Sequence, residues 1–170
     1  MHVVLVQPEI APNTGAIIRL CANTGAELHL VEPLGFVLDD ALLKRGGLDY
    51  HEHATMRVHP NVDTAFATLP DRRFGFSSRG TTRYTDVAFA PDDVLVFGAE
   101  RAGLDDRTMA LIPEERMLTI PMRPHNRSLN LANAVSIVLY EAWRQHGFAG
   151  AAPDGGTGTA ERLHLDPFDT

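Results

Sequence analysis

The sequence predicts an α/β protein with one parallel sheet, and two stretches carry this prediction. Residues 2–31 show a strand–helix–strand pattern, which is typical of a βαβ unit with a right-handed crossover. Residues 118–146 run from a short apolar strand through a polar loop into a long helical pattern. A chain of 170 residues, 44% of them hydrophobic, supports one sizeable core but not two comfortable domains. We therefore expect a single domain over residues 1–150 and a flexible acidic tail over residues 151–170.

The first strand covers residues 2–6, which are predicted to be buried. Two prolines within residues 7–12 then favour an extended loop. A helix is expected over residues 13–22, with the Asn-Thr pair at its start as cap and Gly25 as its stop. Residues 27–31 are the second strand, which completes the βαβ unit.

The middle of the chain alternates short apolar runs with Gly- and Pro-containing turns. These runs predict further helices and strands of the same sheet. We expect helices at residues 39–45, 62–69 and 105–111, strands at residues 56–59, 74–78 and 94–97, and a short edge strand near residues 84–89.

The C-terminal helix is expected to begin after Ser128 as N-cap and to end near His146. It is apolar on nearly every side, so it lies either deep in one domain or between two chains. Asn130 and Asn133 in its first turn need partners, since an unpaired buried amide costs about 1–3 kcal/mol. Two interpretations remain open. The amides close the preceding loop, or the loop and the helix start form a ligand cradle, because a helix N-terminus offers N–H groups to an anion.

Composition narrows the class of protein. No apolar run approaches the roughly 20 residues of a membrane helix, and no signal-peptide pattern is visible, so we expect a cytoplasmic protein without a membrane partner. The single Cys21 excludes an internal disulfide or a multi-cysteine zinc site. A net charge of −7 argues mildly against nucleic acid. However, 14 of the 15 basic residues are Arg, which suits bidentate phosphate contacts, so charge alone decides neither way.

Three loops follow presumed parallel strands, at residues 76–80, 97–104 and 120–128, where open α/β sheets bind ligands. The sequence contains no GxGxxG, P-loop or GxSxG pattern that would indicate a Rossmann nucleotide site, an NTPase or a hydrolase. The cluster of residues 51–53 with His59 could bind a metal, but a solvated loop is the favoured interpretation, and no metal is expected.

Residues 126–135 (NRSLNLANAV) and 140–145 (YEAWRQ), with the IPM that precedes them, resemble the third motif of the SPOUT RNA methyltransferases. The three loops, in their order, resemble the family's donor-binding loops. Residues 8–15 (PEIAPNTG), followed by Arg19, resemble its first motif. The resemblance covers roughly residues 3–148 and is greatest to the enzymes that methylate the wobble nucleotide of tRNA. Ala11, Ala16 and Arg79 depart from the usual family residues.

The resemblance implies a parallel-sheet fold with a deep C-terminal trefoil knot, a homodimer, and S-adenosyl-L-methionine as methyl donor. It implies 2′-O-methylation of nucleotide 34, a cytidine or modified uridine, in the anticodon stem-loop of tRNA. The alternatives are another RNA position, or a non-catalytic RNA-binding or regulatory module on the same scaffold. The implied catalytic residues are Arg19 and Asn13; the implied donor-binding residues are Phe76, Gly98, Glu100, Ile120, Met122, Ser128, Leu129 and Asn133; the implied RNA-binding residues are Arg127, His125, Arg79, Arg83 and Tyr140.

Overall fold

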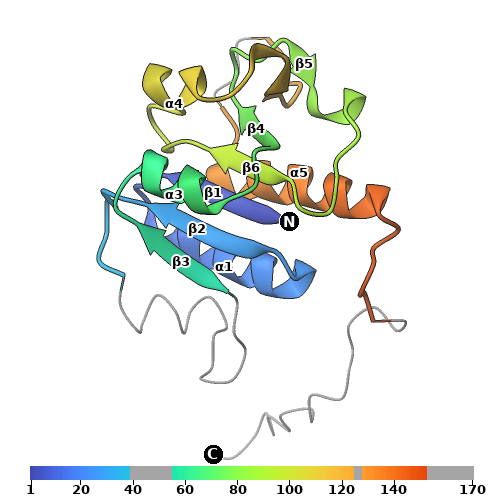
Figure 1. The fold of residues 1–170 in the computed structure, drawn as a ribbon, viewed down its shortest axis with the longest axis horizontal. Coiled ribbons are helices and arrows are strands. Elements are labelled where there is room, and N and C mark those ends of the chain that lie inside the picture. Colours follow the sequence, from blue (N-terminus) through green and yellow to red (C-terminus); the bar gives the residue numbers. More distant parts are fainter. Residues whose placement is uncertain (39–54, 125–127, 153–170) are drawn as a thin grey trace, which may run out of the picture.

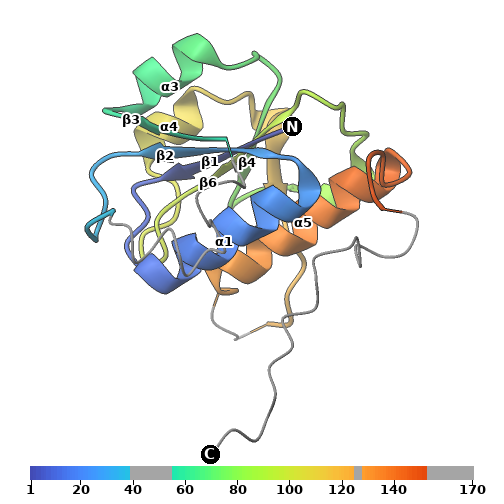
Figure 2. The same ribbon diagram turned by 90° about the horizontal axis from the view of Figure 1, so that it is seen from below.

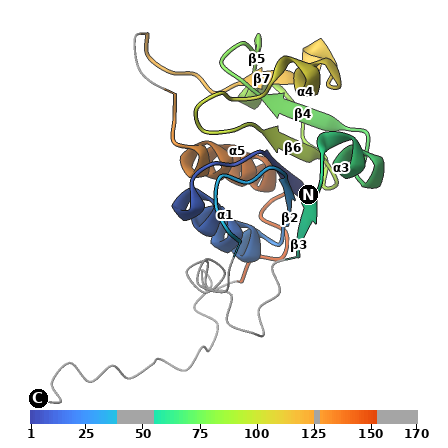
Figure 3. The ribbon, with the colours of Figure 1, turned by 90° about the vertical axis from the view of Figure 1, so that its left-hand side faces the viewer.

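A parallel sheet with the strand order β3-β2-β1-β6-β4-β7-β5 organises the structure, a computed structural model that describes residues 1–38, 55–124 and 128–152 (Figure 1). Each pair of neighbouring strands runs parallel. The strands are β1 (His2–Val6), β2 (Glu27–Val31), β3 (Met56–His59), β4 (Arg73–Phe76), β5 (Thr82–Arg83), β6 (Val94–Phe97) and β7 (Met117–Thr119). Figure 3 shows β3 at one end of the sheet and β5 with β7 at the other.

Helices cover both faces of the sheet. The α-helices of the described residues are α1 (Ala11–Thr24), α3 (Val62–Thr68), α4 (Asp106–Ala110) and α5 (Leu131–Gln145), and two 3-10 turns cover Tyr84–Asp86 and Glu114–Arg116. Helices α1 and α5 lie side by side on one face, and α3 and α4 lie on the other (Figure 2). None of the helices in the described part of the chain is long and apolar enough to cross a membrane.

The two faces bury separate apolar clusters, because successive strand residues point to opposite sides. Leu5, Leu28 and Leu95 face α1 and α5, whereas Val4 and Val96 face α3 and α4. Strand β6 is apolar throughout and β1 is apolar after His2, as parallel strands buried on both faces usually are. The predicted α/β parallel-sheet class is therefore confirmed.

Four strands match their predicted ranges, but the edge strand predicted near residues 84–89 is wrong. The strand at this edge is β5, which pairs with β7, and a 3-10 turn follows it directly. The backbone beyond that turn is satisfied by a side chain instead of a strand. Gln145 accepts from the Phe89 N–H at 2.9 Å and donates to the Val87 carbonyl at 3.1 Å.

The predicted starts of α1 and α5 are corrected. Helix α1 begins earlier, after Ile10, with Asn13 and Thr14 buried inside its first turn. Helix α5 is capped by Asn130 and not by Ser128, since Asn130 Oδ1 accepts from the N–H groups of Ala132 and Asn133 at 2.9 and 3.3 Å. The predicted stop at Gly25 is confirmed, because this residue takes the left-handed conformation (φ 70°) that glycine favours.

Two further predictions lie outside the described residues: the helix at residues 39–45 and most of the tail at residues 151–170. The helices predicted at residues 62–69 and 105–111 are confirmed as α3 and α4 with slightly shorter ranges. The threading of the chain through a deep knot stays a prediction.

Candidate active site

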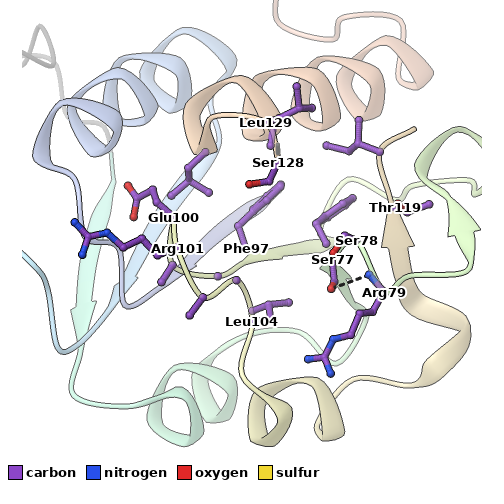
Figure 4. A pocket seen from close by; sticks show the side chains of 18 of the residues that line it. Ser77, Ser78, Arg79, Phe97, Glu100, Arg101, Leu104, Thr119, Ser128 and Leu129 are labelled. Atoms are coloured by element: carbon purple, nitrogen blue, oxygen red, sulfur yellow. Dashed lines mark hydrogen bonds between the residues drawn. The ribbon is translucent and has the colours of Figure 1, made fainter. Parts of the chain in front are cut away.

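A cavity of about 310 Å³ opens where β4, β6 and β7 end, and the three predicted loops form its walls (Figure 4). Parallel strands present their carboxyl ends at one edge, so loops far apart in the sequence meet there. The lining residues are Phe76, Ser77, Ser78, Arg79, Phe97, Gly98, Ala99, Glu100, Arg101, Ala102, Gly103, Leu104, Thr119, Ile120, Met122, Ser128, Leu129, Leu131 and Ala134.

Two stacked rings form the apolar base of the cavity. The Phe76 and Phe97 ring centroids are 4.6 Å apart with an interplanar angle of 11°. The two residues end the neighbouring strands β4 and β6, and both are buried. Such a base offers a flat apolar surface to a ligand.

The loop after β6 folds back tightly on itself. The Gly103 N–H donates to the Ala99 carbonyl at 2.8 Å, and Gly103 has a φ of 70°. A Cβ at Gly98 would lie 2.0 Å from the Gly103 carbonyl carbon. Gly98 is therefore required by the loop itself, so a side chain there would displace the wall of the cavity before it reached a ligand.

The Glu100 carboxylate fastens this loop to the start of α1. It accepts from the Glu9 N–H at 2.7 Å, the Ile10 N–H at 3.2 Å and Asn13 Nδ2 at 2.9 Å. In return, Glu9 Oε2 accepts from the Arg101 N–H at 3.2 Å. The carboxylate of Glu100 is thus committed to positioning the backbone next to the cavity.

Asn13 extends the connection to α5. Asn130 Nδ2 donates to Asn13 Oδ1 at 2.8 Å, while Asn130 Oδ1 caps α5. A single hydrogen-bonded chain, Glu100–Asn13–Asn130, therefore joins the β6 loop, the start of α1 and the start of α5. We call it the amide chain. The Asn130 amide thus bonds the start of its own helix and the start of α1, and both interpretations of this amide stay predictions.

Seven of the eight residues expected to bind the donor line this one cavity: Phe76, Gly98, Glu100, Ile120, Met122, Ser128 and Leu129. Asn133 is not among the lining residues, and its side chain lies on the exposed side of α5. Asn13, expected to be catalytic, is buried in the amide chain and is not among the lining residues either, and its catalytic role stays a prediction.

The residues expected to contact RNA are spread over the surface around the cavity. Arg79 lines the cavity and pairs with Asp106 at 2.8 Å; both side chains are exposed, so this ion pair is weak and open to exchange. Arg83 is exposed on β5, and Tyr140 is 44% exposed on α5. His125 and Arg127 lie outside the described residues.

Arg19 lies exposed on α1 and is not among the lining residues. It follows the first residue of α1 by eight positions, which is about 12 Å along a helix axis. The amide chain places the start of α1 at the cavity, and α1 lies beside α5 on one face of the sheet (Figure 2).

The sequence located the loops but missed two parts of the site. Phe97 was placed in the loop 97–104 but was not named among the donor-binding residues, although a strand end that precedes Gly98 at the carboxyl edge is a signal for a pocket residue. The pairing of Asn130 with Asn13 spans 117 positions and left no local signal.

A parallel α/β sheet with a loop-lined cavity at the carboxyl ends of its strands defines a class of proteins that bind a small organic ligand there. Within this class, the chain belongs to the SpoU rRNA Methylase family, whose pattern matches residues 1–140.

Relatives of known function are similar over nearly their whole length. The chain is 57% identical over 154 residues to the tRNA (cytidine(34)-2′-O)-methyltransferase of Burkholderia ambifaria, covering 89% of this chain and 99% of that protein. It is 48% identical over 152 residues to the enzyme of the same name from Escherichia coli K12, covering 89% and 97%.

Solved structures share the fold. A structure described as "Structural insights into the 2-OH methylation of C/U34 on tRNA" matches with a TM-score of 0.78 at 44% identity, over 86% of this chain and 95% of that one. The SpoU methyltransferase AviRb from Streptomyces viridochromogenes, in complex with AdoMet, matches with a TM-score of 0.71 at 28% identity, over 86% of this chain and 57% of that one.

Proposed function

We propose that this chain transfers a methyl group from S-adenosyl-L-methionine to the ribose 2′-OH of nucleotide 34, a cytidine or uridine, in the anticodon loop of tRNA. The observation that carries the proposal is the convergence of the three loops on one cavity, with seven of the eight expected donor-binding residues on its walls. Relatives 57% and 48% identical bear the name of this activity and match across 99% and 97% of their lengths.

The cavity fits the donor chemically. Its volume of about 310 Å³ lies at the lower end of the roughly 300–1,000 Å³ typical of small-molecule sites. The stacked Phe76 and Phe97 and the aliphatic Leu104, Ile120 and Leu129 offer apolar surface to a base. The backbone of the tight loop after β6 and the Ser128 hydroxyl offer polar groups to a ribose and an amino-acid tail. When bound, the donor supplies an electrophilic methyl group on a sulfonium.

The protein must then activate a poor nucleophile, because a ribose hydroxyl has to lose its proton as it attacks. Arg19 is our candidate for this step. Arginine is a permanent cation in proteins, so Arg19 would bind the neighbouring phosphate and stabilise the developing alkoxide, while water or the phosphate takes the proton. Arg79 and Arg83 bind further phosphates, and Tyr140 offers a ring to RNA or to a partner chain.

We further propose a symmetric homodimer that acts in the cytoplasm, where tRNA is found. Arg19 is exposed and about 12 Å along α1 from the helix start that borders its own cavity. A partner chain packed against α1 and α5 would receive this side chain at its own cavity. A single domain over residues 1–150, with a knotted C-terminal segment, is part of the same proposal.

A methyl-transfer assay tests the activity directly. Purified protein, labelled S-adenosylmethionine and a tRNA anticodon stem-loop should give labelled RNA. The same stem-loop with 2′-deoxyribose at position 34 should give none, while deoxyribose at position 33 serves as the matched control and should still be methylated. Equal labelling of a duplex that lacks the loop would contradict the proposed substrate.

Donor binding separates the enzyme from its strongest alternative, a non-catalytic RNA-binding module on the same scaffold. Calorimetry should detect binding of S-adenosylmethionine and S-adenosylhomocysteine to the RNA-free protein. RNA binding without any donor binding would favour the non-catalytic module.

A further inference from the structure

Three histidines and one glutamate lie together in β1, β2 and β3, outside the cavity described above. His2 stands opposite Glu27 in the β1–β2 register, and His29 follows Glu27 by two residues on the same face of β2. His59 stands opposite Val31, one step further along that face. Strand alternation therefore brings all four side chains to the face of the sheet that α3 and α4 cover.

Three donor atoms of this group form a compact triangle. His2 Nδ1 is 3.3 Å from His29 Nε2, and Glu27 Oε2 is 3.6 Å from His2 Nδ1 and 3.8 Å from His29 Nε2. Tetrahedral zinc with bonds of about 2.0–2.1 Å holds neighbouring ligand atoms about 3.4 Å apart. The triangle in the protein matches this spacing to within a few tenths of an ångström, so little movement is needed to bind an ion.

We propose that His2 Nδ1, Glu27 Oε2 and His29 Nε2 bind a Zn²⁺ ion, with water in the fourth position. Two imidazoles and one carboxylate are donors that zinc accepts readily, whereas Mg²⁺ and Ca²⁺ prefer oxygen ligands only. Among the described residues these are the three that come close enough to hold one ion together.

His59 orients the central ligand. His29 Nδ1 and His59 Nε2 are 3.0 Å apart, and in the tautomer the proposal requires, the N–H on His29 Nδ1 donates to His59 Nε2. This tautomer leaves His29 Nε2 with its lone pair for the metal. A hydrogen bond from the second ring nitrogen is the usual support of a metal-bound histidine.

The surroundings suit an exchangeable ion. The side chain of His29 is 2% exposed, whereas those of His2 and Glu27 are 17% and 38% exposed, which gives the ion a path from solvent.

The position of the proposed zinc site in the sheet predicts that the ion stabilises the fold. His2 and Glu27 are the first residues of β1 and β2, whereas the cavity lies at the carboxyl ends of β4, β6 and β7. A bound ion would clip β1 to β2 and, through His59, to β3. We therefore expect zinc to raise the melting temperature without changing donor affinity.

The test uses the full chain without a histidine tag, freed of metal by a chelator that is then dialysed away. Calorimetric titration with ZnCl₂ should show one ion per chain, and zinc should raise the melting temperature. Glu27→Gln and His2→Gln should each weaken zinc binding at least tenfold and remove the thermal shift. Glu32→Gln, which changes an exposed carboxylate just beyond the end of β2, is the matched control and should bind zinc like the wild type.

These variants keep the test independent of folding, because His2 and Glu27 are partly exposed while His29 is buried. If Glu27→Gln and His2→Gln bind zinc as tightly as the wild type, the ion lies at other histidines and the proposal is overturned. The absence of zinc binding by the wild type would overturn it as well. Cobalt supplies a check on geometry: the strong visible absorption of four-coordinate Co²⁺ supports the site, and the pale spectrum of six-coordinate Co²⁺ contradicts it.

Discussion

Asn130 carries two tasks with one amide. Its oxygen caps α5, and its nitrogen donates to Asn13 in the amide chain that holds the start of α1 at the cavity. Because Asn13 in turn donates to Glu100, the wall loop after β6 depends on a residue in a different part of the sequence. A change at Asn130 should therefore affect both the stability of the fold and the affinity for the donor.

Asn130→Ala should destabilise the protein by about 1–2 kcal/mol, the usual cost of a lost N-cap, and should also weaken donor binding. Urea denaturation and donor calorimetry measure the two effects. Asn133→Ala is the matched control three residues further on, since the Asn133 side chain is exposed and does not line the cavity. If Asn133→Ala weakened donor binding as much as Asn130→Ala, that result would support the donor-binding role predicted for Asn133 from the sequence.

Arg19→Ala should keep its fold and its donor affinity but lose methyl transfer, because Arg19 lies outside the cavity. Arg19→Lys separates two roles. A charge role leaves measurable activity and a nearly unchanged pH–rate profile, whereas a proton-accepting role shifts the profile towards the lower pKa of lysine. Full activity of Arg19→Ala on tRNA would remove Arg19 from the mechanism.

At the scale of helices and strands, the sequence predicted correctly those elements that depend on the local pattern of apolar residues. The strands at residues 2–6, 27–31 and 94–97 were identified because mainly apolar runs of this length are buried wherever they pair, and the strand at residues 56–59 matches its predicted range although it is half exposed. The segment near residues 84–89 was assigned wrongly because its partner is the side chain of Gln145, 56 residues beyond Phe89.

The same limit applied to the candidate site. Its loops follow from the order of strands and turns, which the sequence contains. The stacking of Phe76 on Phe97 depends on which strands are neighbours, and β4 and β6 are adjacent in the sheet although β5 separates them in the chain. The cap of α5 depended on geometry as well, since both Ser128 and Asn130 are favourable cap residues and only Asn130 reaches the N–H groups.

Glu141 on α5 supports the segment that replaces the edge strand. It accepts from Arg144 Nε and Nη2 at 2.8 Å each and from Gln145 Nε2 at 3.0 Å. The hydrogen bonds from Arg144 and then Gln145 lower the pKa of Glu141 to about 2. Gln145 is thereby held in the orientation that bonds Val87 and Phe89.

This shift predicts a pH dependence of stability. The pKa of Glu141 is lower in the folded state (about 2) than its ordinary 4.5, so the unfolded state binds more protons between these values. Its contribution is complete above about pH 4.5 and is lost as the pH falls towards 2. We expect a gain of at most about 1 kcal/mol, because Arg144 is exposed and screened by solvent. The difference in melting temperature between wild type and Glu141→Gln should shrink from pH 6 to pH 3; a constant difference would contradict this.

At the scale of the molecule, α5 presents two unlike sides. Val135, Val138 and Leu139 are buried against the sheet, while Ile137 and Tyr140 remain 37% and 44% exposed on the side that carries Asn133. Arg19 is exposed on the neighbouring α1. Paired with its own copy about a twofold axis, such a surface would cover its apolar groups and bring each Arg19 towards the other chain.

Tyr140→Ala and Ile137→Ser should therefore shift the protein from dimer to monomer in light scattering. Trp143 is a poorer choice for truncation, because it packs against Phe148 and donates to the Ala149 carbonyl within its own chain. Val58→Ser is the matched control, since Val58 is 44% exposed on the edge strand β3. A wild-type monomer at micromolar concentration would contradict the dimer.

A mixed dimer tests whether Arg19 serves the partner's cavity. Arg19→Ala leaves the cavity intact, whereas Gly98→Ala distorts its wall, because the new Cβ would lie 2.0 Å from Gly103. Each variant alone should be inactive.

If Arg19 acts across the interface, the Arg19→Ala chain, whose cavity is normal, receives Arg19 from its Gly98→Ala partner. One of the two sites in the mixed dimer is then complete. Unfolding the variants together and refolding them should then restore about a quarter of wild-type activity, since half of the dimers formed at random are mixed and each has one complete site. If Arg19 instead acts within its own chain, no site in the mixed dimer is complete, and the mixture should stay inactive. Donor calorimetry on the refolded mixture checks that the Arg19→Ala cavities are intact in both cases.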